Sequence, residues 1–196
     1  MKVISCVLAL AALVAAGAAD AQSIVRVRGT ITAVDGNVMA VKSRDGRDLK
    51  LQLPDNVAVA VAKAVRFDDI RDGDYLGATT TPGPDGSAIA SELHYLAPTT
   101  QEGQVASDLA PGSTMTNANV ASKVVATGKR ELTLRFKNGT QKVVVPDGVT
   151  IVRSVPGTRA DLVPGEYVFA VVQVATDGTM TAPRIQVSKD GVRPAQ

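Results

Sequence analysis

The chain has 196 residues, with 21 Lys and Arg against 19 Asp and Glu, and a net charge of +2 at pH 7. Aromatic residues make up only 3% and Trp is absent, which argues against a nucleic-acid groove because such grooves stack bases on aromatic rings. The single cysteine is Cys6. Its place near the start of the chain excludes disulfides and Cys-based metal or nucleophile sites from the rest of the sequence.

Residues 1–21 have the three parts of a secretory signal peptide. Lys2 supplies a positive start, residues 3–16 are an apolar run, and Ala19-Asp20-Ala21 is an A-x-A cleavage signal. The run is too short to span a bilayer comfortably, and no later stretch is apolar enough to cross one. We therefore expect cleavage near Ala21 and Gln22 and a mature protein in the periplasm or outside the cell.

Residues 22–98 are predicted to form short strands and turns. Val25, Val27 and Ile31 alternate with polar residues, a period of two that is typical of a half-buried strand. Gly29 in the middle of this strand indicates a bend or bulge. We predict strands over residues 25–34, 38–43, 49–53, 75–78 and 88–96. Residues 57–65 fit either a strand or a helical turn. Small sheets of this kind remove their unpaired edges by closing into a barrel.

The pattern returns about 92 residues later, the length of a small domain. The segment Asp69–Tyr75 returns as Asp161–Tyr167, and Pro54-Asp55 returns as Pro146-Asp147. We therefore expect an all-β fold of two tandem OB-like, Greek-key barrels over residues 22–98 and 117–189. A polar linker, 99–116, joins them, and a tail, 190–196, follows. Domains of about 70 residues are marginally stable alone, so the repeats are expected to pack together or to share strands.

Several motifs occur in a distinctive order along the mature chain. They are Val27–Gly36, Leu53–Asn56, Asp69–Tyr75, Pro84–Gly86 and Ser113–Ala118. This order resembles that of exported, two-repeat bacterial proteins of the DUF5666 type. The resemblance implies a periplasmic β protein with small OB-like barrels, and it implies no agreed activity. Members are often labelled metal ABC transporter permeases, a label that this sequence does not support because a permease needs several apolar spans. One departure is Ser122 at the position of Gly29, which predicts a less bent strand.

Charge divides unevenly between the two repeats. Residues 24–98 carry a net charge of −1, and residues 117–189 carry +5. A basic repeat favours an anionic partner, such as lipid headgroups, lipopolysaccharide or another polyanion. The alternative is an ordinary solvated surface of mixed charge, because no cluster exceeds two adjacent basic residues.

The end of the linker is the predicted ligand site. It combines hydroxyl, thioether and amide side chains in Ser113, Thr114, Met115, Thr116 and Asn117. Loops with distinctive residues often carry function, and these groups suit a polar ligand. They also suit an ordered connector that bonds back across the junction between the barrels.

Glu92 and His94 form the predicted metal site. Residues two apart on a strand face the same side, so both side chains can reach one ion such as zinc or copper. An acidic turn adds Asp68, Asp69, Asp72 and Asp74, whose oxygens suit Ca²⁺ in principle. The alternatives are a surface pair at Glu92 and His94, and carboxylates that cap the turn, with Gly73 and Gly165 at positive φ.

No nucleophile elbow or phosphate-binding loop occurs in the sequence. We therefore predict an exported, non-enzymatic binding or scaffold module of the cell envelope without a cofactor, acting through its barrel loops and linker. Its expected partner is an envelope protein or an anionic envelope component, not nucleic acid. The alternatives are a metal-handling protein that uses Glu92, His94 and the acidic turn, and a hydrolase with an unrecognised carboxylate pair.

Overall fold

The computed structural model describes residues 23–83, 87–126 and 128–195. The predicted signal peptide, residues 1–21, and the motif Pro84–Gly86 lie outside these ranges. A single 13-stranded sheet holds the described chain together, so the all-β prediction is confirmed. None of the described residues forms a helix that is long and apolar enough to span a membrane.

The elements of the first half recur in the same order in the second half. The first half contains β1 (Ser23–Asp35), β2 (Val38–Ser43), β3 (Asp48–Gln52), β4 (Ala58–Ala64), the short 3-10 helix η1 (Phe67–Asp69), β5 (Tyr75–Pro82) and β6 (Ala88–Tyr95). After β7 (Gly103–Ala106), the second half contains β8 (Thr114–Ala126), β9 (Lys129–Phe136), β10 (Gly139–Val144), β11 (Thr150–Pro156), η2 (Arg159–Asp161), β12 (Tyr167–Val174) and β13 (Met180–Val187).

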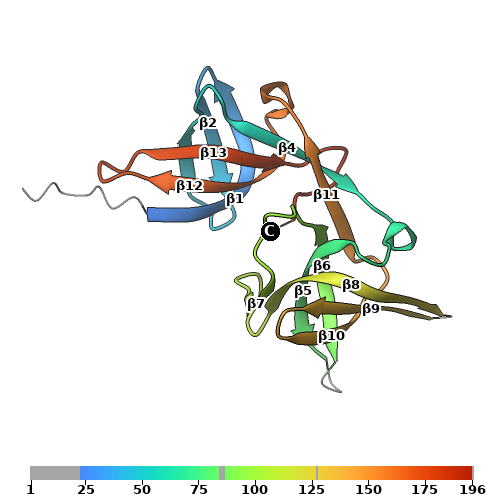
Figure 1. Cartoon of the computed structure of the whole chain (residues 1–196). Coiled ribbons are helices and arrows are strands. Elements are labelled where there is room, and N and C mark those ends of the chain that lie inside the picture. Colours follow the sequence, from blue (N-terminus) through green and yellow to red (C-terminus); the bar gives the residue numbers. More distant parts are fainter. Residues whose placement is uncertain (1–22, 84–86, 127, 196) are drawn as a thin grey trace, which may run out of the picture.

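Five strands close the first barrel in the order β1-β2-β3-β13-β12 (Figure 1). All neighbours are antiparallel except β3 and β13, which pair in parallel. This is the arrangement of an OB-like Greek-key barrel. The inward-facing residues are aliphatic and buried, with Ile31, Val41 and Leu51 from one half of the chain and Val168 and Ile185 from the other.

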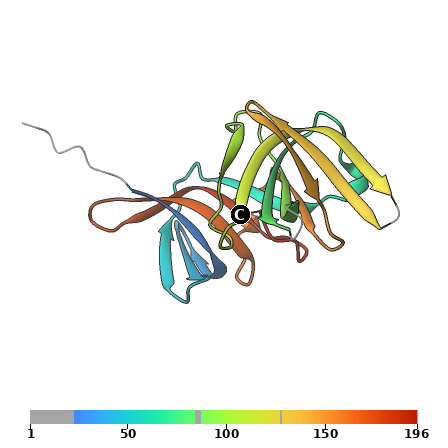
Figure 2. The ribbon, with the colours of Figure 1, turned by 90° about the horizontal axis from the view of Figure 1, so that it is seen from below.

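The second barrel is built in the same way from β8-β9-β10-β6-β5. Its parallel contact joins β10 to β6. Leu132, Leu134 and Val143 pack in its core against Leu76 and Leu93 of the first half. Figure 2 shows the two barrels side by side from below.

The two halves of the chain therefore exchange their last hairpins. The β12–β13 hairpin completes the first barrel, and the β5–β6 hairpin completes the second. The predicted ranges 22–98 and 117–189 thus do not form one barrel each, although the expected sharing of strands is present. The reason lies in the segment 57–65, where Ala58–Ala64 form the extended strand β4 and carry the chain out of the first barrel instead of turning it back.

Strands β4 and β11, which we call the bridge, join the barrels. They pair with each other antiparallel, while β4 also pairs with β13 and β11 with β6. On one face of the bridge, Val61 packs in the core of the first barrel and Ile151 packs in the core of the second. The other face packs Ala62 and Val152 against Ala195. The predicted tail therefore lies against the bridge, and Figure 1 places the C-terminal end between the barrels.

Gly29 allows strands β1 and β2 to approach each other closely. A Cβ atom at this position would lie 2.3 Å from the carbonyl oxygen of Lys42. The pairing register of β1 shifts just afterwards, between Ile31 and Ala33. The register of β8 shifts between Val120 and Ser122, so β8 is also irregular although it has no glycine there. The glycine at position 29 is thus required by the close approach of β1 to β2 as well as by the bend of β1.

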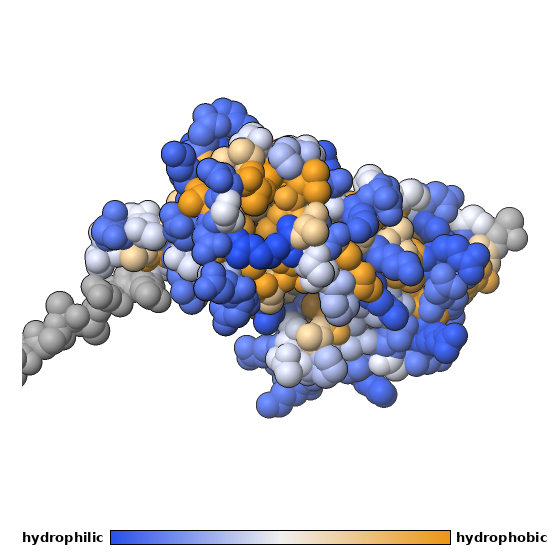
Figure 3. All heavy atoms as spheres, turned by 90° about the horizontal axis from the view of Figure 1, so that it is seen from above, coloured by the Kyte–Doolittle hydropathy of each residue, from blue (hydrophilic) through white to orange (hydrophobic). Residues whose placement is uncertain are grey.

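The helix η2 lies across one end of the first barrel. Arg159 donates to the carbonyl oxygen of Gly36 and to Oδ1 of Asn37, each at 2.9 Å. Asp161 accepts from the backbone N–H of Thr158 at 2.9 Å and so caps this turn. Figure 3 shows hydrophobic side chains gathered at this end of the molecule.

The predicted positive φ angles are confirmed at both turn glycines, Gly73 and Gly165.

Candidate functional site

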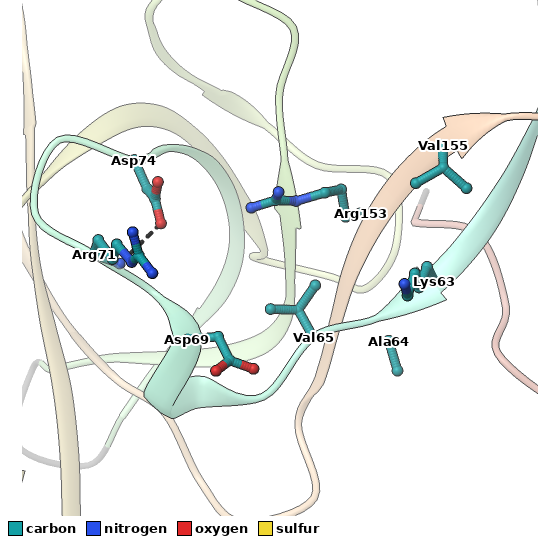
Figure 4. A pocket seen from close by; sticks show the side chains of 8 residues that line it. All are labelled: Lys63, Ala64, Val65, Asp69, Arg71, Asp74, Arg153 and Val155. Atoms are coloured by element: carbon teal, nitrogen blue, oxygen red, sulfur yellow. Dashed lines mark hydrogen bonds between the residues drawn. The ribbon is translucent and has the colours of Figure 1, made fainter.

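A groove of about 660 Å³ opens beside the bridge (Figure 4). We call it the bridge groove. Side chains from β4, the η1 region and β11 line it, namely Lys63, Ala64, Val65, Asp69, Arg71, Asp74, Arg153 and Val155. The exchange of hairpins creates this site, because it brings β4 of one half alongside β11 of the other.

Lys63 and Arg153 stand directly opposite each other in the antiparallel bridge. Residues paired in this way share a face of the sheet, and like charges so placed destabilise it. Within the described ranges, neither side chain has a carboxylate at ion-pair distance. Arg153 instead stacks its guanidinium 3.8 Å from the centre of the Tyr95 ring. The groove therefore has a cationic pair without a counter-ion.

The two carboxylates of the groove, Asp69 and Asp74, already accept hydrogen bonds. Asp69 accepts two hydrogen bonds from Arg66, at 2.9 and 3.1 Å, and these bonds hold the pKa of its carboxyl below the usual range. Asp74 accepts from the backbone N–H of Arg71 at 2.8 Å and from the hydroxyl of Tyr95 at 2.9 Å. Burial is the main cause that raises the pKa of Tyr95. Arg66 balances the charge of Asp69, whereas Asp74 keeps its charge because both of its donors are neutral. The three cations Lys63, Arg71 and Arg153 therefore exceed the remaining negative charge, that of Asp74.

The predicted metal ligands Glu92 and His94 are neighbours on β6. Their Oε1 and Nδ1 atoms lie 3.5 Å apart, and both side chains are largely buried. The imidazole lies over Gly77, where a Cβ would come within 2.5 Å of Nε2. In the described part of the chain, no group of three His, Cys, Asp or Glu side chains is placed to hold a metal. The pair therefore offers fewer ligands than the three or four typical of zinc, and the described carboxylates of the acidic turn form no such group either.

His94 also borders a cleft of about 330 Å³ between the barrels. The opposite wall includes Arg184 and Gln186 of β13, the residues that the repeat aligns with Glu92 and His94. Gln186 accepts a hydrogen bond from the Ser154 hydroxyl at 2.9 Å. The exchange of hairpins thus brings the corresponding strands β6 and β13 to one cleft. β6 contributes an imidazole to it, and β13 contributes a guanidinium and an amide.

The predicted linker site lies on β8 and just before it, with Ser113 preceding Thr114, Met115, Thr116 and Asn117. Ser113 donates to the carbonyl oxygen of Ala110 at 2.7 Å. Thr116 is fully buried and donates to Gln141 Oε1 at 2.8 Å, and Asn117 donates to the carbonyl oxygen of Gln101 at 3.0 Å. These polar atoms are engaged in holding the linker against the second barrel, the role of an ordered connector.

A further linker contact, not predicted from the sequence, reaches the first barrel. Asp108 accepts two hydrogen bonds from Arg28, at 2.9 and 3.0 Å. Arg28 is only 8% exposed, and its guanidinium also lies 5.3 Å from the centre of the Phe169 ring. The Arg28 hydrogen bonds, assisted by the charge of Arg26, hold the pKa of Asp108 below its usual range. The pair anchors the linker to the outside of β1.

Replacing Asp108 with Asn should lower the free energy of unfolding by about 1 kcal/mol near pH 7, because Arg28 stays buried with a weaker partner while solvent screens the half-exposed carboxylate. The folded-state pKa of Asp108 lies below the ordinary 3.8. The stabilisation is therefore complete above that value and is lost as the pH falls through the folded-state pKa. Urea denaturation near pH 7 and about pH 3 measures this loss. An equal pH dependence in wild type and D108N would contradict it.

The groove cations were missed because they are far apart in the sequence. Lys63 and Arg153 are separated by a full repeat, and the opposition of two strands from different halves has no local signature. One local signal exists. Lys63 is the only charged residue in the Ala- and Val-rich strand β4, and a lone charge in such a segment indicates an exposed, specific position.

Comparisons with protein-family models, with curated proteins and with solved structures find no match to this chain. The resemblance to the DUF5666 type therefore stays a prediction from the order of the motifs.

Proposed function

We propose that this protein is an exported, non-enzymatic binding module that holds a phosphate-bearing polyanion of the cell envelope in the bridge groove. The observation that carries the proposal is the Lys63–Arg153 pair, two like charges directly opposite each other on the bridge. A bound anion would relieve their repulsion and supply the missing counter-ion. Arg153 suits phosphate because its planar guanidinium can donate two parallel hydrogen bonds.

The groove supports this proposal better than the net charge of the second repeat does. The exchange places β12 and β13 in the first barrel, so the charge of +5 over residues 117–189 does not gather in one barrel. The concentration of cations comes instead from three separate parts of the chain, at Lys63, Arg71 and Arg153. A long polyanion can lie along an open groove of this kind and contact several cations at once.

The mature chain, residues 22–196, should bind vesicles that contain phosphatidylglycerol, or lipopolysaccharide, at low ionic strength. It should not bind vesicles of phosphatidylcholine alone. High salt should weaken the binding, because ions screen exposed charges within a few ångströms at molar concentration. The double variant Lys63→Gln/Arg153→Gln should bind roughly 10-fold more weakly, which corresponds to about 1.4 kcal/mol. Co-sedimentation with the vesicles measures both effects.

The matched control is Lys137→Gln/Lys142→Gln, which removes the same charge from exposed positions of the second barrel. It should retain most of the binding. Equal losses in the two double variants would show that net charge, and not the groove, is responsible. Thermal unfolding provides an independent readout, since removal of the opposed cations should leave the fold at least as stable as the wild type.

A further inference from the structure

The first residues of β1 form an open strand edge. Ser23–Thr30 pairs with β12 on one side. On the other side, the pairing with β2 begins only at Gly29. Among the described residues, no strand covers the second side of residues 23–28. Open edges of this kind can accept a further strand.

The hydrogen bonds on either side of β1 show which backbone groups face the open edge. The backbone N–H of Ile31 donates to the carbonyl oxygen of Glu166 at 2.9 Å, so the backbone groups of the odd-numbered residues of β1 point toward β12. The carbonyl oxygen of Arg28 accepts from the N–H of Arg44 at 2.7 Å, so the even-numbered residues face the other way. Because bonding direction alternates along an antiparallel strand, the N–H and C=O groups of Ile24 and Arg26 face the open edge.

A small pocket of about 120 Å³ lies beside this edge. We call it the arginine pocket, because its lining includes Arg26, Arg28, Arg44 and Arg47. Asp108 binds Arg28 and Asp45 binds Arg47. Over the described ranges, Arg26 and Arg44 have no carboxylate at ion-pair distance. The pocket therefore has two uncompensated cations next to unpaired backbone groups.

We propose that an extended acidic peptide segment of another protein adds to the open edge of β1 and places its carboxylates on Arg26 and Arg44. The backbone groups of Ile24 and Arg26 supply the pairing, and the arginines select acidic side chains at alternate positions. Asp108 is an example of the expected carboxylate–arginine geometry, since its two oxygens accept hydrogen bonds from the two terminal nitrogens of Arg28. Ile24, which is 70% exposed, supplies an apolar contact. A lipid or a polyphosphate matches the charges but cannot pair with the strand.

A fluorescent peptide of alternating Asp and Val tests the proposal against residues 22–196 by fluorescence anisotropy. Two further peptides have the same sequence and charge but carry N-methyl groups on alternate residues, one peptide for each of the two possible registers. The unmodified peptide should bind at low salt, and one N-methylated register should bind roughly 10-fold more weakly because it cannot donate to the β1 edge. Equal binding of all three peptides would overturn strand addition.

Variants locate the site and separate it from the bridge groove. Arg26→Gln/Arg44→Gln should weaken peptide binding roughly 10-fold while vesicle binding persists. Lys63→Gln/Arg153→Gln should do the reverse, and Lys137→Gln/Lys142→Gln should change neither by much. Wild-type peptide affinity in the Arg26/Arg44 variant would overturn the arginine pocket as the site. The N-methylated peptides use the wild-type protein, so the conclusion does not depend on the folding of a variant.

Discussion

Residues 22–99 produced alone should not form a folded monomeric barrel. In the full chain the β5–β6 hairpin of this fragment completes the second barrel, and the first barrel takes β12 and β13 from the other half. Without the second half, the buried faces of Ile31, Val41 and Leu51 lose the hairpin that covers them. We expect the fragment to be unfolded, or to associate with further copies that supply the missing hairpin.

The complementary fragment, residues 100–196, should rescue the first one. Mixing the two should give a 1:1 complex that unfolds cooperatively, because each fragment returns the hairpin that the other lacks. Size-exclusion chromatography with light scattering gives the stoichiometry, and circular dichroism gives the unfolding transition. A monomeric, cooperatively folded fragment of residues 22–99 would contradict the exchange of hairpins.

Gly29→Ala should be among the most destabilising single substitutions in the first barrel. The added Cβ would lie 2.3 Å from the Lys42 carbonyl oxygen and 2.8 Å from the Ser43 Cα. Both are backbone atoms, so relief of the clash requires β1 and β2 to separate. The strands would then lose the hydrogen bonds that join the segment Gly29–Asp35 of β1 to β2. We expect the free energy of unfolding to fall by about 3 kcal/mol, as for severe overpacking. Urea denaturation of residues 22–196 measures it.

Ser122→Ala is the matched control, because Ser122 occupies the corresponding position in the second repeat and already carries a side chain. Its free energy of unfolding should stay within about 0.5 kcal/mol of the wild type. A neutral Gly29→Ala would show that the two strands can separate easily, and the close approach would then not explain the glycine.

The exchange of hairpins also explains why the proposed anion site lies at the bridge. Each barrel closes with strands from both halves, so β4 and β11 must cross between them and pair with each other. Part of each strand lies between the two cores, where side chains are free to face solvent. Lys63 and Arg153 occupy these positions, and the surrounding valines and alanines belong to the barrels or pack against the tail.

Some site features follow from local spacing and others do not. The proximity of Glu92 and His94 follows from the period of two along a strand, and their atoms lie 3.5 Å apart. The acidic turn is likewise a local feature, although Asp69 and Asp74 bind Arg66, Tyr95 and backbone groups. The opposition of Lys63 and Arg153 depends on the register between strands from different halves. No local pattern specifies that register.

Local sequence patterns are sufficient to predict the all-β class, most strand positions and the turns with positive φ at Gly73 and Gly165. These features depend on side-chain alternation and on the conformational freedom of glycine, which act over a few residues. The assignment of each hairpin to a barrel is visible only in the folded protein. That choice depends on pairing between strands that lie far apart in the sequence, which local pattern does not specify. The extended bridge strands make that choice, and they thereby bring the groove cations together.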